Sequence, residues 1–226
     1  MRLVALVFML IVLSPAHADL LDDCTQGKKV EAKIRGCTHL IEQERFRKLP
    51  PNTQALVYYS RAFGYYERGD LDRARLDTTE ALNLKPDDMR FILLRGTISY
   101  EQGRSFDGDG DKAKYEASLE SAFKDFSRII ETEPSNAQAY SMRGLVYHDR
   151  SKFETAVEEQ TKAIGINPKY VDAYMRRGQA HGAQALLRKT PGARERAMDD
   201  FRTVLKLNPK HREARKTLQN LRDFVR

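Results

Sequence analysis

The sequence has 226 residues, of which 41% are hydrophobic and 31% are charged, and it contains no tryptophan. This composition excludes a disordered or low-complexity chain, a collagen and a multi-pass membrane protein. Two cysteines are too few for a disulfide-built scaffold, and their spacing is not that of a zinc site. The formal net charge of +7 leaves several kinds of partner open, so the position of that charge along the chain matters.

The first eighteen residues have the three parts of a secretory signal peptide. Arg2 gives a positive start, residues 3–13 form an apolar run, and residues 16–18 read Ala-His-Ala, the form of a signal-peptidase site. The alternative is a membrane anchor, but this apolar run is too short to span the hydrocarbon core of a bilayer. We therefore predict a signal peptide over residues 1–18 and a periplasmic or secreted mature protein.

Two cysteines follow the predicted cleavage point. Twelve residues separate Cys24 from Cys37, so the pair lacks the C-x-x-C spacing of a redox-active site. In an oxidising compartment two cysteines pair more often than they stay free. A bond between them would contribute roughly 3 kcal/mol by closing a short loop in the unfolded chain. A structural disulfide is therefore favoured over two free thiols.

A repeat of 34 residues organises the chain from residue 55 onward. Residues 55–88 and 137–170 share an aromatic, a small and an aromatic residue at positions 4, 8 and 11, an alanine at position 20 and a proline at position 32. Residues 89–136 and 171–209 repeat the small residue and the proline, with insertions of about 14 and about 7 residues between them. The helical spacing predicts that each unit is a helical hairpin that must stack on its neighbours, with the proline stopping its second helix.

These landmarks resemble the tetratricopeptide repeat (TPR) family, with four units inside residues 52–209. The resemblance implies an all-α fold whose helical hairpins form a right-handed superhelix, an α-solenoid. One departure from the family is an arginine in the usual leucine slot, which we interpret as structural: Arg61, Arg95, Arg143 and Arg177. The cysteine pair is similar to that of secreted bacterial members. Residues 19–51 are accordingly predicted to be a degenerate hairpin, and residues 210–226 a capping helix.

The resemblance also implies a binding groove, because positions 2, 5, 9 and 12 of each first helix face the concave side in this family. Carried over by register, these positions are Leu56, Tyr59, Phe63, Tyr66, Arg90, Leu93, Thr97, Tyr100, Gln138, Ser141, Leu145, His148, Asp172, Met175 and Gln179. The aromatic N-terminal half suits an apolar peptide or helix, although Tyr59, Phe63 and Tyr66 could instead pack against the N-terminal hairpin. The family's clamp for acidic tails needs Lys and Asn where Tyr59 and Phe63 stand, so that partner is disfavoured.

The first insertion places aspartates at alternate positions from Asp107 to Asp111, as a calcium loop does. It lacks the glycine and the glutamate that such a loop needs at its sixth and twelfth positions, where Lys112 and Ser118 stand. We predict a solvated turn in which Asp111 caps the following helix.

Motifs typical of catalytic or metal sites are scarce elsewhere in the sequence. The histidines after the cleavage point form no paired motif, and no nucleophile elbow, zinc-protease or phosphate-loop motif is present. The carboxylate pairs Glu158–Glu159 and Asp199–Asp200 are expected on solvated outer faces. We predict no enzyme, no cofactor and no metal.

The positive charge is concentrated at the C-terminal end. Residues 188–226 hold 12 Lys/Arg and 5 Asp/Glu, a net charge of +7. The sequence thus predicts a periplasmic or secreted scaffold for protein–protein interaction that uses its concave groove. The alternative is an envelope-surface binder that uses this basic end on anionic lipid or cell-wall polymer. The basic residues could also simply form the solvated polar face of a capping helix. Nucleic acid is not an expected partner, and the oligomeric state is not predicted.

Overall fold

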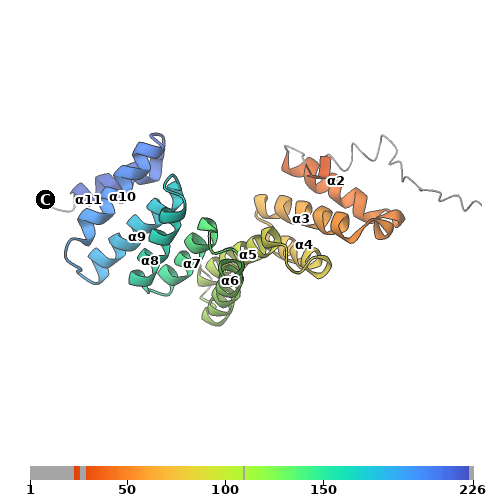
Figure 1. Cartoon of the computed structure of the whole chain (residues 1–226), viewed down its shortest axis with the longest axis horizontal. Coiled ribbons are helices and arrows are strands. Elements are labelled where there is room, and N and C mark those ends of the chain that lie inside the picture. Colours follow the sequence, from red (N-terminus) through yellow and green to blue (C-terminus); the bar gives the residue numbers. More distant parts are fainter. Residues whose placement is uncertain (1–22, 26–28, 109, 224–226) are drawn as a thin grey trace, which may run out of the picture. The chain divides into compact units, whose positions relative to one another are not determined.

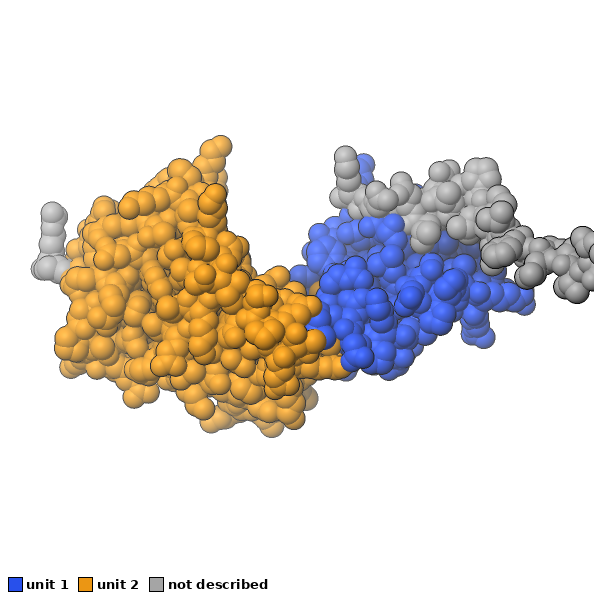
Figure 2. Space-filling model, in the orientation of Figure 1, with its two compact units in different colours: residues 1–91 blue, residues 92–226 orange. Residues whose placement is uncertain are grey.

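The computed structural model describes residues 23–25, 29–108 and 110–223. Contacts divide the chain into two compact units, residues 1–91 and residues 92–226, which Figure 2 shows in two colours. Every regular element in the described part is helical, so the predicted all-α class of helical hairpins is confirmed. The predicted signal peptide lies outside the described residues. Within the described residues, no helix combines the length and the apolar character needed to cross a bilayer.

Unit 1 is built around an N-terminal helix and the first predicted hairpin (Figure 1). Its elements are α2 (Val30–Glu42), the 3₁₀ helix η1 (Glu44–Lys48), α3 (Pro51–Glu67), α4 (Leu71–Leu84) and the start of α5. A disulfide joins Cys24 to Cys37 across a Cα–Cα distance of 4.6 Å, as predicted. Both sulfurs lie in a buried cluster with Phe46 and Val57, so the disulfide fixes the chain before α2 to the core of this unit.

Unit 2 continues the hairpins as paired helices (Figure 1). Its elements are α5 (Met89–Gly108), α6 (Lys112–Thr132), α7 (Ala137–Asp149), α8 (Phe153–Ile166), α9 (Val171–Leu187), α10 (Ala193–Leu207) and α11 (Arg212–Asp223). The first insertion lengthens both helices of its hairpin, because α5 has 20 residues and α6 has 21, whereas α7 and α8 have 13 and 14. Asp111 Oδ1 accepts a hydrogen bond from the Lys114 N–H at 3.1 Å, which confirms the predicted cap.

The small residue at position 8 lets the two helices of a hairpin approach closely. A Cβ placed on Gly96 would lie 2.7 Å from Cε1 of Phe126, and one on Gly178 would lie 2.8 Å from Cε1 of Phe201. Both distances are far below ordinary carbon contacts of about 3.5–4.0 Å. The second helices α4, α6, α8 and α10 each end two residues before the proline at position 32, as predicted.

An ion pair between the two helices recurs in all four hairpins. Its members are Arg61–Asp77 at 2.7 Å, Arg95–Asp125 at 2.6 Å, Arg143–Glu159 at 2.8 Å and Arg177–Asp200 at 2.7 Å. All four carboxylates are buried, and a buried charge needs a partner of this kind. The arginines are therefore structural, as predicted.

The same ion pairs correct one prediction. Glu159 and Asp200 were expected on solvated outer faces, but they are only 3% and 5% exposed because the arginine of the facing helix neutralises them. Their neighbours Glu158 and Asp199 are exposed, as expected. An acidic residue stands at position 23 of every unit once the insertions are removed, and that regularity was the signal in the sequence.

Candidate functional site

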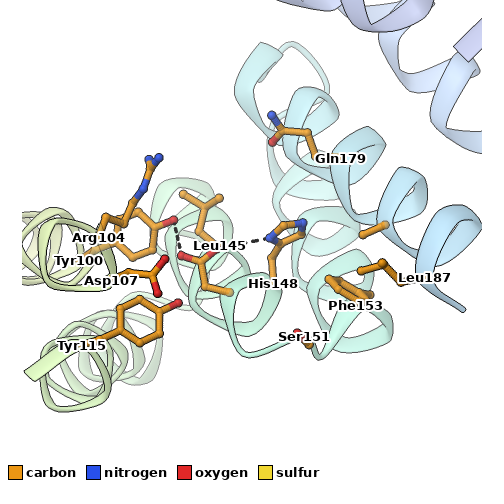
Figure 3. A pocket seen from close by; sticks show the side chains of 12 residues that line it. Tyr100, Arg104, Asp107, Tyr115, Leu145, His148, Ser151, Phe153, Gln179 and Leu187 are labelled. Atoms are coloured by element: carbon orange, nitrogen blue, oxygen red, sulfur yellow. Dashed lines mark hydrogen bonds and ion pairs between the residues drawn. The ribbon is translucent and has the colours of Figure 1, made fainter. Parts of the chain in front are cut away.

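A cleft of about 750 Å³ opens within unit 2 (Figure 3). Its walls come from the end of α5, the start of α6, the end of α7 with the turn into α8, and the last turns of α9. The lining residues are Tyr100, Arg104, Asp107, Tyr115, Leu145, His148, Asp149, Ser151, Phe153, Gln179, Ala183 and Leu187.

Four of the predicted groove residues meet in this cleft. Tyr100 and His148 occupy position 12 of their helices, and Leu145 and Gln179 occupy position 9. These positions lie on the C-terminal half of each first helix, so the side chains of α5, α7 and α9 converge there. The convergence of positions 9 and 12 was predictable from the repeat, whereas the depth of the cleft was not.

One end of the cleft combines phenol and carboxylate groups, and we call it the acidic corner: Tyr100, Asp107, Tyr115 and Asp149. Tyr100 Oη donates to Asp149 Oδ2 at 2.8 Å, and the other oxygen of Asp149 lies 3.4 Å from His148 Nδ1. In Figure 3 the side chains of Tyr100, Asp107 and Tyr115 point toward one another.

Burial and negative charge keep both phenols of the acidic corner protonated. Burial, and then the carboxylate of Asp149, raises the pKa of Tyr100 well above its ordinary value. Burial, followed by the charges of Asp149 and Asp107, raises the pKa of Tyr115 to about 12.

Three apolar side chains also line the cleft, and we call them the apolar wall: Leu145, Phe153 and Leu187. In Figure 3, Leu145 lies on the side of Tyr100, whereas Phe153 and Leu187 lie beyond His148. The His148 ring meets Phe153 edge-on, with ring centres 5.3 Å apart. Phe153 is buried, but Leu187 at the end of α9 is 70% exposed. Large apolar side chains at that exposure are candidates for contact with a partner.

Several lining residues were missed by the sequence analysis. Arg104, Asp107 and Tyr115 belong to the first insertion, and Leu187 lies in the stretch lengthened by the second. The insertions extend α5 and α9 beyond the usual end of a repeat helix, and these extra turns form two of the walls. The insertions were visible in the sequence and a helix was predicted to follow Asp111, but the extension of α5 and α9 was not predicted.

Three predicted groove residues are buried. Tyr100 is only 4% exposed, although it lines the cleft, and Ser141 and Met175 lie inside the hairpins. Ser141 is fully buried, where its hydroxyl donates to Gln160 Oε1 at 2.7 Å and accepts from Arg176 Nη1 at 2.7 Å. Met175 is buried in a cluster that includes Phe201 and residues of α11. Because neighbouring helices cover both side chains, neither belongs to an accessible surface.

The predicted groove residues of unit 1 are partly covered. Leu56, Tyr59, Phe63 and Tyr66 are half-buried, and Arg90 is exposed. Tyr59 stacks on Phe91 with ring centres 4.8 Å apart, while Lys33 of α2 lies 4.9 Å from the centre of the Phe63 ring. The aromatic stripe therefore packs against its neighbours and still leaves part of each ring accessible. In unit 2, Leu93 and Thr97 are half-buried, and Gln138 and Asp172 are exposed.

No group of three or more His, Cys, Asp or Glu side chains is placed to hold a metal ion in the part of the chain that the structure describes. Within the cleft, the Asp149 carboxylate is occupied by Tyr100 and His148. The arrangement offers hydrogen bonds, negative charge and apolar surface, which are the means of binding a ligand non-covalently.

Comparison with known proteins assigns the repeat. Residues 144–184 match a family model described as TPR repeat, and this segment contains much of the cleft. Among curated proteins, human serine/threonine-protein phosphatase 5 is 32% identical over 107 residues, which are 47% of this chain and 20% of that protein. The chain thus spans about a fifth of the length of that relative.

Solved structures share the fold at low sequence identity. TTC0263, a thermophilic TPR protein of Thermus thermophilus, superposes with a TM-score of 0.69 at 14% identity, covering 91% of this chain and 97% of that one. YrrB, described as a TPR protein with an unusual peptide-binding site, gives a TM-score of 0.60 at 13% identity, covering 92% of each chain. These similarities establish a fold of TPR hairpins.

Proposed function

We propose that this protein with TPR repeats is an exported scaffold for protein–protein interaction and that the cleft of unit 2 holds a segment of its partner. The observation that carries the proposal is the convergence of Tyr100, Leu145, His148 and Gln179 on one cleft of about 750 Å³, which the exposed Leu187 also lines. That volume falls in the range of about 300–1,000 Å³ that is usual for ligand sites. The peptide-binding site named for YrrB supports the class of ligand.

The chemistry of the cleft favours binding over catalysis. Its hydroxyl groups belong to Ser151 and to tyrosines held protonated, and the hydroxyl bonded to the Asp149 carboxylate is the Tyr100 phenol, whose pKa is raised. Its extended helices provide a rigid frame, which lowers the entropic cost of binding a partner segment. The half-buried aromatic stripe of Tyr59, Phe63 and Tyr66 in unit 1 is proposed as a second contact surface.

Export is proposed from the N-terminal sequence and is supported by the disulfide. A Cys24–Cys37 bond persists in an oxidising compartment and is rare in the cytosol. Expression in a bacterial host followed by mass spectrometry of the mature chain tests the proposal directly. We expect an N-terminus at Asp19 in the periplasmic fraction, and a full-length chain retained in the cytosol would contradict it.

The envelope-surface alternative stays a second candidate, because most C-terminal basic side chains of the described residues are exposed. Arg194 is half-buried and donates to the carbonyl of Leu221. Arg202 and Arg215 are exposed although they bond to Asp199 and to the carbonyl of Pro209. Co-sedimentation with vesicles containing phosphatidylglycerol separates the two functions, because the scaffold proposal expects no salt-sensitive binding.

The scaffold proposal is tested by selecting random hexapeptides displayed on phage against residues 19–226. Leu187→Ser removes part of the apolar wall, and Leu186→Ser is its matched control, because Leu186 is 58% exposed on the adjacent position and does not line the cleft. We expect enriched peptides to lose affinity for the Leu187→Ser variant alone. Phe63→Glu reports in the same way on the aromatic stripe of unit 1. If neither Leu187→Ser nor Phe63→Glu weakens the binding of any enriched peptide, the proposal is wrong.

A further inference from the structure

The acidic corner of the cleft has more negative than positive charge. Two carboxylates, Asp107 and Asp149, line the cleft together with one guanidinium, Arg104. Figure 3 shows the Arg104 side chain directed away from Asp107. Among the described residues, Asp107 has no ion-pair partner, and Asp149 is bonded to a phenol and faces a histidine. The exposed Asp107 carboxylate is thus accessible to a positive group from a ligand, and Asp149 adds negative charge to the same cleft.

The Tyr115 ring adds a second attraction for a cation. Tyr115 is half-buried and lines the cleft together with Asp107 and Asp149, whereas Tyr100 is only 4% exposed and packs with Leu119 and Phe126. A cation gains from the face of a tyrosine ring as well as from a carboxylate. The aliphatic stem of a lysine or arginine can lie along such a ring while its charged end reaches a carboxylate.

The apolar wall lies in the same cleft, with Phe153 and Leu187 on the other side of His148 (Figure 3). Leu187, 70% exposed, projects from the last turn of α9, and Leu145 and Phe153 complete the surface. A ligand that only carried positive charge would leave this wall in water. A ligand that fits the whole cleft carries an apolar side chain within a few residues of its cation.

We propose that the cleft takes a partner segment in which a lysine or arginine lies next to a large aliphatic or aromatic residue. The cation binds in the acidic corner, and the apolar side chain packs on Leu187 and Leu145. This inference rests on the proposed function and adds the chemistry of the partner. It also requires that acidic segments be rejected, because they would place like charges beside Asp107 and Asp149.

The test uses the hexapeptides that are enriched on the wild-type chain. Their affinities are measured for single-residue variants of the protein and for a peptide with one residue replaced. Asp107→Asn removes a carboxylate that is exposed and supports no packing, so the fold is retained; Glu158→Gln, an exposed carboxylate on α8 outside the cleft, is the matched control. Asp149→Asn is a second variant that still accepts a hydrogen bond from Tyr100. The peptide change replaces its basic residue by norleucine, which keeps the aliphatic stem.

We expect enriched hexapeptides to carry Lys or Arg within two positions of an aliphatic or aromatic residue. Fluorescence anisotropy should show a loss of about fivefold in affinity for Asp107→Asn, as expected for one partly exposed charge pair, and a larger loss when both aspartates are replaced. The norleucine peptide should bind wild type more weakly and should lose little further affinity on Asp107→Asn. Glu158→Gln should bind as wild type does.

The outcomes separate this inference from the proposed function. Peptides that depend on Leu187 but show no preference for basic residues, or that prefer acidic ones, overturn the inference and leave the scaffold function intact. Unchanged affinity for Asp107→Asn and for Asp149→Asn overturns it as well. If no enriched peptide depends on the cleft, the assignment of the cleft as a binding site and this inference are both wrong.

Discussion

The contact between α9 and α10 gives a quantitative test of the repeat packing, through Gly178. An added Cβ would lie 2.8 Å from Cε1 and 3.0 Å from Cζ of Phe201, and 3.2 Å from Cβ of Asp200. The Phe201 ring is 1% exposed and packs with Met175, Val204 and Leu218, so it has little room to move. Relieving the overlap requires the ring or α10 to shift by roughly 0.5–1 Å, and overpacking of this kind costs about 1–3 kcal/mol.

Gly182 provides the matched control for Gly178→Ala, because it lies on the same helix one turn later. A Cβ on Gly182 would have no atom within 4 Å outside its own helix backbone. Gly182→Ala should therefore show only the helix-propensity gain, about 0.5–1 kcal/mol. The two substitutions share that gain, so the difference between their free energies of unfolding isolates the packing cost.

Urea and thermal unfolding followed by circular dichroism would measure both variants. We expect Gly178→Ala to be less stable than Gly182→Ala by about 1–3 kcal/mol, which for a chain of this size is about 2–4 °C in Tm per kcal/mol. Combining Gly178→Ala with Phe201→Leu should remove most of the packing cost in a double-mutant cycle. Equal stability of the two alanine variants would refute the packing argument.

Three further predictions follow from other buried groups. Arg177→Met leaves the Asp200 carboxylate buried without a partner and should cost about 3–5 kcal/mol in urea unfolding, whereas Arg177→Met with Asp200→Leu should recover most of that loss. Burial lowers the pKa of His181, so the unfolded chain binds a proton more readily. The folded protein has its full stability above the ordinary histidine pKa near 6.5 and loses stability as the pH drops toward the lower pKa of His181 in the folded state. His181→Gln should flatten this dependence of the unfolding free energy on pH. An unchanged pH profile in the variant would contradict the prediction. Replacing Cys24 and Cys37 by serine should lower the free energy of unfolding, measured without a reductant, by about 3 kcal/mol. The stability of the double variant should no longer depend on dithiothreitol. Full stability of the double variant would show that the disulfide is dispensable.

The landmarks of the repeat predicted the fold because they report on contacts inside one hairpin. A glycine at position 8 and an aromatic residue on the facing helix meet at a separation set by the helix geometry, as Gly178 and Phe201 do. The lengthening of α6 was also readable, since Tyr115, Leu119, Ala122 and Phe126 follow the spacing of one helical face. The turn at Asp111 and the helix that it caps were predicted, whereas the continuation of α5 as far as Gly108 was not.

The cleft could be predicted only in part, because it depends on contacts between successive hairpins. The family register placed Leu145 and Ser141 on the same surface, yet Arg176 of the next first helix covers Ser141 and leaves Leu145 accessible. Whether a side chain is covered is decided by the neighbouring helix. Sequence periodicity fixes the face of a residue on its own helix, and it does not state which neighbour reaches that face.

The total charge of the chain is a poor guide to the ligand of the cleft. The sequence carries a formal net charge of +7, which on its own suggests an acidic partner. Exposed charges separated by more than about 8 Å are largely screened at physiological ionic strength, so a ligand in the cleft responds to the groups around it. Those groups are Asp107 and Asp149 against Arg104, and their balance is negative. The sign of the local charge, opposite to that of the whole protein, is what makes a basic partner segment the informative probe.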